Sequence, residues 1–140
     1  MAVLTNPEKT GIPIAPGNMD TLALITHAAA AAGVSSPDQI NAYYRGLQIG
    51  VNITAGTGTA PTLQVILEGK DAASGTYYPL LASVAIAAVA GFTLLSFYPG
   101  LAATANVTAN QALPRVWRVR TIIGGVAPAV TATIGTSLVI

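Results

Sequence analysis

The sequence predicts an all-β protein: an antiparallel β-sandwich of seven or eight strands, with jelly-roll or Greek-key connections and an extended N-terminal arm. Several segments alternate apolar and polar side chains with a period of two, which places successive residues on opposite faces of a strand. Glycine- and proline-containing turn signals recur about every ten residues, a spacing typical of antiparallel sandwiches and small barrels. We expect the arm to cover residues 1–19 and one sandwich domain to cover residues 20–140.

The predicted arm has no helical or strand period. Pro7, Pro13 and Pro16 prevent a helix of useful length and interrupt any β-ladder. We expect the arm to order against a neighbouring subunit through apolar contacts, with a disordered tail as the alternative. The candidate assembly contacts in the arm are Val3, Leu4, Ile12, Pro13 and Ile14.

Residues 20–33 fit either a strand or a helix. Asp20 could cap a helix that ends at Gly33, and the alanine run 28–32 favours helix formation. Residues 22–26 alternate as a strand would, and we favour a strand because the rest of the chain is β. His27 is the only histidine, so we expect it to have a structural role instead of acting as a ligand or base.

The most regular alternation lies in residues 47–54. The side chains expected on its apolar face are those of Leu47, Ile49, Val51 and Ile53. Residues 55–61 then predict a loop, and its two glycines lack the third glycine, lysine and helix that a phosphate-binding loop needs. Alternation returns in residues 63–67, and residues 68–75, with three charged side chains, predict a solvated hairpin loop.

Further strands are expected at residues 77–87, 91–98, 115–123 and 129–140, with a long connection at 99–112 that crosses between sheets. Residues 80–98 are uncharged and long enough for a membrane helix, which needs about 20 residues. We favour two strands there, because no Lys or Arg flanks the segment and Ser83 and Gly91 interrupt it.

The strand at residues 115–123 carries the only tryptophan. Its alternation places Trp117 and Val119 in the core. We expect Arg118 and Arg120, the remaining candidate assembly contacts, to lie on the opposite face, where they meet carboxylates, carbonyl groups or a neighbouring subunit. Gly124 and Gly125 predict a turn that ends the strand.

Composition limits the possible functions. The chain is 52% hydrophobic but only 8% charged, against about 25% charged in an ordinary soluble domain. Much of its surface is therefore expected to be covered by lipid, by other copies or by a larger assembly. A net charge of +1 argues against nucleic-acid binding, and the absence of cysteine excludes disulfides and thiolate metal sites. No nucleophile lies beside a base, so we expect no enzymatic activity, no cofactor and no metal.

Four segments together resemble small virion proteins of tailed bacteriophages. They are LQVILEGKD at 63–71, SGTYY at 74–78, YPGL at 98–101 and LPRVWRVR at 113–120. The similarity runs from about residue 45 to the C-terminus. It implies a structural component of a phage particle and does not by itself choose between capsid, neck and tail.

With the low charge, this resemblance leads us to expect a capsid decoration or cement protein. Such a protein would be made in the host cytoplasm and bind the outer capsid surface of the virion as a homo-oligomer, with a trimer as the expected form. Its partners would be its own copies and the major capsid protein, with no membrane and no nucleic acid. A tail, neck or baseplate component is the alternative.

A carbohydrate-binding sandwich module is the alternative from another class, based on the aromatic residues Tyr43, Tyr44, Tyr77, Tyr78 and Trp117. Adjacent tyrosines on a strand point to opposite faces, which argues against a single aromatic platform.

Overall fold

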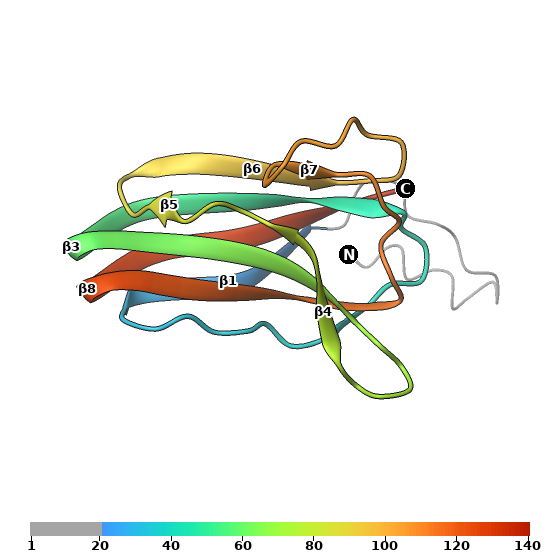
Figure 1. Ribbon diagram of the computed structural model, residues 1–140, viewed down its shortest axis with the longest axis horizontal. Helices are drawn as coiled ribbons and strands as arrows, with labels where there is room; N and C mark the ends of the chain where they lie inside the picture. The colour runs from blue at the N-terminus through green and yellow to red at the C-terminus, as the bar shows by residue number, and fades with distance from the viewer. Residues whose placement is uncertain (1–20) are drawn as a thin grey trace, which may run out of the picture.

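The computed structural model describes residues 21–140, which form eight strands and no helix (Figure 1). The all-β prediction is therefore confirmed, and the described residues include no helix that could cross a membrane. The predicted arm and its five candidate contacts lie outside the described residues. The strands are β1 Thr21–Ala30, β2 Gln39–Ile40, β3 Gly46–Lys70, β4 Tyr77–Ala82, β5 Ile86–Ala87, β6 Gly91–Phe97, β7 Thr108–Ala109 and β8 Val116–Val139.

Two long strands organise the sheet. β3 and β8 pair antiparallel over nearly their whole length, from Gly46 opposite Val139 to Gly69 opposite Trp117. β1 and β2 pair with the other edge of β8, while β4, β5 and β6 pair with the other edge of β3. β7 adds a short parallel pairing to the end of β6. All of the strands therefore belong to one mixed, mostly antiparallel sheet.

β3 and β8 bend at the same level of the ladder. The bends contain residues with positive φ, at Gly58 (105°) and Ala60 (48°) in β3 and at Gly125 (112°) and Ala127 (49°) in β8. Figure 1 shows the two halves of β3 running side by side and joined at the end of the molecule where β8 also turns back. The sheet is thus folded over on itself.

The predicted loop at residues 55–61 and the predicted turn at Gly124 and Gly125 are both wrong. The ladder continues through them, with Thr57 opposite Ala129 and Thr59 opposite Val126, although the register shifts there. Turn-forming residues allow a strand to bend without ending it when the partner strand bends beside it. The strands expected at 115–123 and 129–140 are accordingly one strand, β8.

One buried cluster includes residues from both halves of the sheet. Trp117 and Val119 are 1% and 0% exposed, as predicted, and they belong to the same buried cluster as residues from the distant half of the sheet. The predicted apolar face of residues 47–53 is also confirmed. The core residues of β3 and β8 are Leu47, Ile49, Val51, Ile53, Leu63, Val65, Leu67, Trp117, Val119, Val130, Ala132, Ile134 and Leu138.

Residues 21–30 form a strand, as favoured, because pairing with β8 outweighs the helix propensity of the alanines. Residues 80–98 also form strands, namely part of β4, then β5 and β6. The connection 99–112 contains β7, which pairs with the end of β6, and it leads from β6, beside the first half of β3, to β8, beside the second half. It therefore passes between two halves of one sheet and not between two separate sheets. The hairpin loop expected at 68–75 begins only after Lys70, so Glu68 is a strand residue.

Candidate functional site

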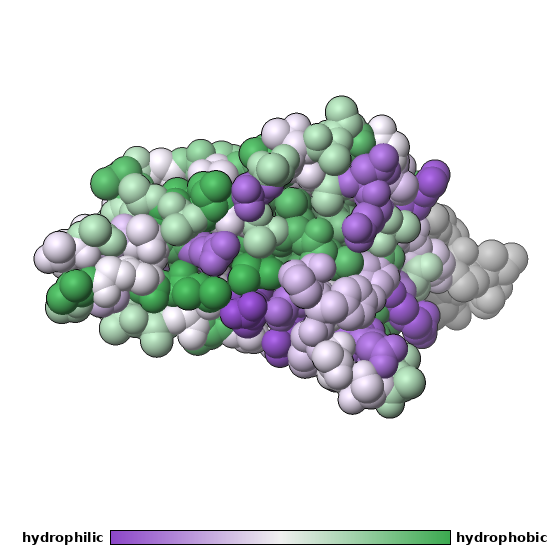
Figure 2. Space-filling view, viewed as in Figure 1, coloured by the Kyte–Doolittle hydropathy of each residue, from purple (hydrophilic) through white to green (hydrophobic). Residues whose placement is uncertain are grey.

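Charged side chains gather on one half of the folded sheet. Within residues 21–140 they are Asp38, Arg45, Glu68, Lys70, Asp71, Arg115, Arg118 and Arg120. Those within strands lie in the second half of β3 and the first half of β8. Figure 2 shows hydrophilic residues concentrated in the right-hand half of the view, whereas the left-hand half, where β3 and β8 bend, is mostly neutral or hydrophobic. The charged half is therefore the place to look for specific polar recognition.

An ion-paired triad lies on the outer face of this half. Arg118 Nε donates to Glu68 Oε1 at 2.8 Å, and Arg120 Nε donates to Glu68 Oε2 at 3.0 Å. The ladder explains the geometry, because Glu68 lies opposite Arg118 and, in this half of the sheet, both strands turn their odd-numbered residues to the core. Glu68 is only 5% exposed. The prediction that Arg118 and Arg120 face away from the core and meet a carboxylate is confirmed.

A second ion pair is joined to the triad through Tyr77. The Arg118 guanidinium lies over the Tyr77 ring, 3.3 Å from its centroid. The Tyr77 hydroxyl donates to Asp38 Oδ1 at 2.7 Å, and Lys70 Nζ donates to Asp38 Oδ2 at 2.8 Å. The hydrogen bond from Lys70, followed by that from Tyr77, lowers the pKa of Asp38 below its ordinary value, and the same contact with Asp38 raises the pKa of Lys70. These hydrogen bonds therefore favour the ionised forms of Asp38 and Lys70.

The triad can accept a further anion. Each arginine uses only Nε toward Glu68, and the terminal guanidinium nitrogens form no hydrogen bond with any described residue. Two guanidinium groups share one carboxylate, so the triad keeps an excess positive charge. The guanidinium group of arginine binds carboxylates and phosphates through paired N–H donors. The Tyr77 ring restrains Arg118, which reduces the entropy lost when a ligand binds.

His27 is a structural residue in this fold. Its ring is 3% exposed, and Nε2 lies 3.0 Å from the Thr121 hydroxyl. That hydroxyl also accepts from the Val34 amide at 2.9 Å and donates to the Val34 carbonyl at 3.1 Å. The contacts therefore hold β1 and the segment after it against β8.

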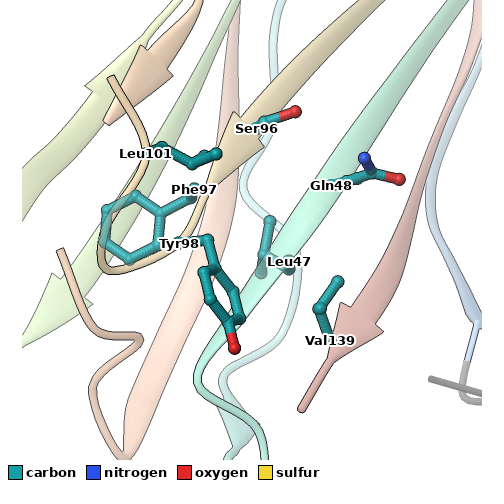
Figure 3. A pocket seen from close by; sticks show the side chains of 7 residues that line it. All are labelled: Leu47, Gln48, Ser96, Phe97, Tyr98, Leu101 and Val139. Atoms are coloured by element: carbon teal, nitrogen blue, oxygen red, sulfur yellow. The ribbon is translucent and has the colours of Figure 1, made fainter. Parts of the chain in front are cut away.

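Two small pockets lie near the ends of the long strands. The first, of about 190 Å³, is shown in Figure 3, where the apolar side chains of Leu47, Phe97, Leu101 and Val139 surround it together with Tyr98. The Tyr98 hydroxyl donates to the carbonyl of Ile140 at 2.7 Å. The second, of about 310 Å³, is lined by Gln39, Ile40, Asn41, Ala42, Tyr43, Tyr44, Trp117 and Leu138. Neither lining brings an acid and a base together, so neither provides general acid–base chemistry.

Three of the aromatic residues suggested for carbohydrate binding line the second pocket, but the five do not form one exposed platform. Trp117 is 1% exposed and Tyr44 is 8% exposed, so both belong to the core. Tyr77 is occupied by Arg118 and Asp38. Within residues 21–140 there is also no group of three or more His, Asp or Glu side chains placed to hold a metal ion.

The structure places the candidate site residues in two groups. Arg118 and Arg120 come together on one carboxylate, whereas the arm residues lie outside the described part. Sequence reasoning missed Glu68 as their partner because it assigned this residue to a loop. The alternation of residues 63–67 was the signal that could have identified Glu68. Continued by one residue, it places position 68 on the same outer face as positions 64 and 66.

Comparisons with protein-family models, with curated proteins and with solved structures found no match. The functional proposal therefore rests on the residues and the fold.

Proposed function

We propose that this protein is a non-enzymatic structural protein of a bacteriophage virion, and specifically a capsid decoration or cement protein. In this proposal it is a β-sandwich with an N-terminal arm that binds the outer capsid surface as a homo-oligomer, with a trimer as the expected form, and stabilises the shell. The resemblance of four sequence segments to phage virion proteins supports the phage particle. The distribution of charge supports an assembly role.

The observation that carries the proposal is the large uncharged part of the sheet. Residues 46–67 and 121–140 contain no charged side chain, and neither does β6. Large apolar side chains are nevertheless exposed there, with Phe92 at 66% and Val126 at 69%. Isolated soluble domains normally cover such surface with charged residues. Contact with other copies or with a capsid shell would remove this apolar area from water.

The charged half supplies the specific contact in this proposal. Arg118 and Arg120 bind a carboxylate of the major capsid protein, while Glu68 and Tyr77 hold the two arginines in place. Arginine is enriched at interfaces and among the residues that dominate binding energy. The apolar residues of the arm, from Val3 to Ile14, add contact area beyond the domain.

A tail, neck or baseplate component would use the same surfaces, so attachment to capsids is the property to measure. The full chain, a chain lacking residues 1–17 and the double variant Arg118→Ala/Arg120→Ala are each added to purified capsids that lack their own copy. Occupancy is measured by gel densitometry and cryo-microscopy. We expect the full chain to decorate the capsid, and both altered proteins to remain folded but bind more weakly.

Arg115→Ala is the matched control, because Arg115 lies in the same segment but is exposed and outside the triad. It should bind like the unaltered chain. Equal capsid occupancy for the truncated and full chains would show that the N-terminal arm does not contribute to attachment. A full chain that decorates no capsid and is found in the tail or neck would contradict the decoration role.

A further inference from the structure

Four of the strands that form edges of the sheet carry features that discourage pairing with another chain. Irregular register, proline and very short length all protect sheet edges. β1 has register shifts between Ala23 and Ile25 and between His27 and Ala30. β4 contains Pro79 and a register shift where it meets residues 67 and 68 of β3. β2 and β5 have only two residues each. These edges are poor templates for strand addition.

β6 is the exception among the described strands. It has seven residues, contains neither proline nor a charged side chain, and pairs with β3 without a register shift. β7 covers only Ser96 and Phe97 on its other side. Figure 1 shows β6 along the upper edge of the molecule, with β7 beside its C-terminal end only. Its first five residues, 91–95, therefore form a regular edge that no described strand covers.

The hydrogen-bonding groups of this edge can be assigned from the neighbouring contacts. The amides of Ser96 and Tyr98 donate outward, to the carbonyl oxygen of Val107 at 3.0 Å and to that of Ala109 at 3.1 Å. In an antiparallel pair, alternate residues direct both N–H and C=O to the same side. Phe92 and Leu94 therefore direct their backbone N–H and C=O groups away from β3, where no described residue pairs with them.

We infer that this edge pairs with the same edge of a second copy, antiparallel and about a two-fold axis at Thr93. In that register Phe92 of each copy lies opposite Leu94 of the other. Both pairs are then of the hydrogen-bonded type, so every outward N–H and C=O at these positions finds a partner. The contact is isologous, as two-fold interfaces are.

The side chains favour the same arrangement. Phe92 and Leu94 are 66% and 45% exposed on the outer face, and the Phe92 ring lies over Gly50, where an added Cβ would come within 3.0 Å of it. Pairing about Thr93 sets the Phe92 ring of each copy against Leu94 of the other, which removes both exposed apolar side chains from water. No charge lies on β6 or on the facing part of β3, so two copies approach without repulsion. The occupant is therefore a second copy of this chain.

This contact does not depend on the proposed virion role, and its test needs only the purified full chain. Sedimentation velocity measures self-association of the unaltered protein, of Phe92→Lys and of the control Ile40→Lys. Ile40 is 65% exposed, an exposure close to that of Phe92, but it lies in the two-residue strand β2, which pairs with β8 and not with β3. Because a lysine on an edge strand opposes pairing, Phe92→Lys should weaken two-fold association by about tenfold or more. Ile40→Lys should leave it unchanged, and equal association of all three proteins overturns the inference.

The register is tested by mixing two variants, Phe92→Lys and Leu94→Glu. Each should associate weakly alone. In a mixed dimer the introduced lysine of one copy would face the introduced glutamate of the other, while the unaltered Leu94 and Phe92 of the second pair stay in contact. Native mass spectrometry should therefore show mixed dimers above the statistical half of all dimers. A mixture at or below that fraction overturns the register.

Amide hydrogen exchange provides a readout that is independent of the total number of subunits. The Leu94 amide should exchange at least about tenfold more slowly in the associated, unaltered protein than in the Phe92→Lys variant. The Phe92 amide of the unaltered protein should also be protected from exchange. Exchange at the solvent rate at both amides in the associated protein overturns the inference, even if the protein forms a trimer through another surface.

Discussion

Trp117 and Arg118 are adjacent in β8, yet their side chains lie in different environments. Trp117 is fully buried, whereas Arg118 reaches the outer face and shares Glu68 with Arg120. Trp117→Ala should lower the free energy of unfolding by about 3–5 kcal/mol, because it opens a large core cavity. Arg118→Ala should cost only about 1 kcal/mol, because Arg120 still pairs with Glu68. Urea denaturation measures both, and equal losses would contradict this assignment of faces.

His27 makes stability depend on pH. Burial lowers its pKa below the ordinary value of 6.5, so the ring stays neutral to lower pH in the folded protein than in the unfolded chain. The unfolded chain takes up a proton more readily as the pH falls through that value, so the contribution of His27 is complete above it and is lost below it. The midpoint of urea denaturation should therefore decrease when the pH is lowered from about 7.5 to about 5.

His27→Gln is the comparison, because glutamine can still donate to the Thr121 hydroxyl but does not titrate. Its midpoint should change less over the same interval. Asp38 and Asp71 contribute little to the pH dependence of stability in this interval. Their pKa values are lowered from 3.8, so their protonation affects stability only in more acidic solution. Parallel pH profiles for the two proteins would show that His27 is not responsible.

At the scale of elements, the bends of β3 and β8 divide one continuous ladder into two halves. Gly125 has a φ of 112°, and a Cβ there would come within 2.8 Å of the Ala60 carbonyl oxygen and 2.9 Å of that of Thr59. Gly125→Ala should therefore destabilise the fold by about 1–3 kcal/mol, since a non-glycine residue is strained in this conformation.

Gly91→Ala is the matched glycine control. Gly91 has no positive φ, and the nearest atom to an added Cβ is 3.8 Å away. Thermal unfolding should show a clear loss for Gly125→Ala and almost none for Gly91→Ala. Similar midpoints for the two variants would mean that the bend tolerates a side chain and does not depend on glycine.

At the scale of the whole molecule, the fold separates charge from apolar surface. The second half of β3 and the first half of β8 present the Glu68 triad, whereas the other half of the same two strands presents an uncharged outer face. One buried cluster includes residues from both halves, so both surfaces rest on the same core. This arrangement suits a protein that makes a specific polar contact on one side and packs against uncharged neighbours on the other.

Local pattern was enough to predict which side chains are buried in parts of β3 and β8 and that the described residues are all-β. Alternation along a strand is a local property, so the burial of Trp117 and Val119 and the outward position of Arg118 follow from a period of two. The same reasoning identified Leu47 to Ile53 as a core face. Low charge likewise indicated an unusual surface without reference to any fold.

The tertiary structure alone decided which strands continue through a bend and which residues distant in sequence come into contact. Gly58 and Gly125 lie in segments with the composition of loops, but each belongs to a strand whose partner bends beside it, and no local pattern records that pairing. Glu68 becomes the partner of Arg118 and Arg120 across fifty and more residues of chain for the same reason. Whether an edge such as β6 is covered depends on every other strand in the sheet. Hydrogen-bond pairing between strands is non-local, and its outcome is therefore set by the whole fold.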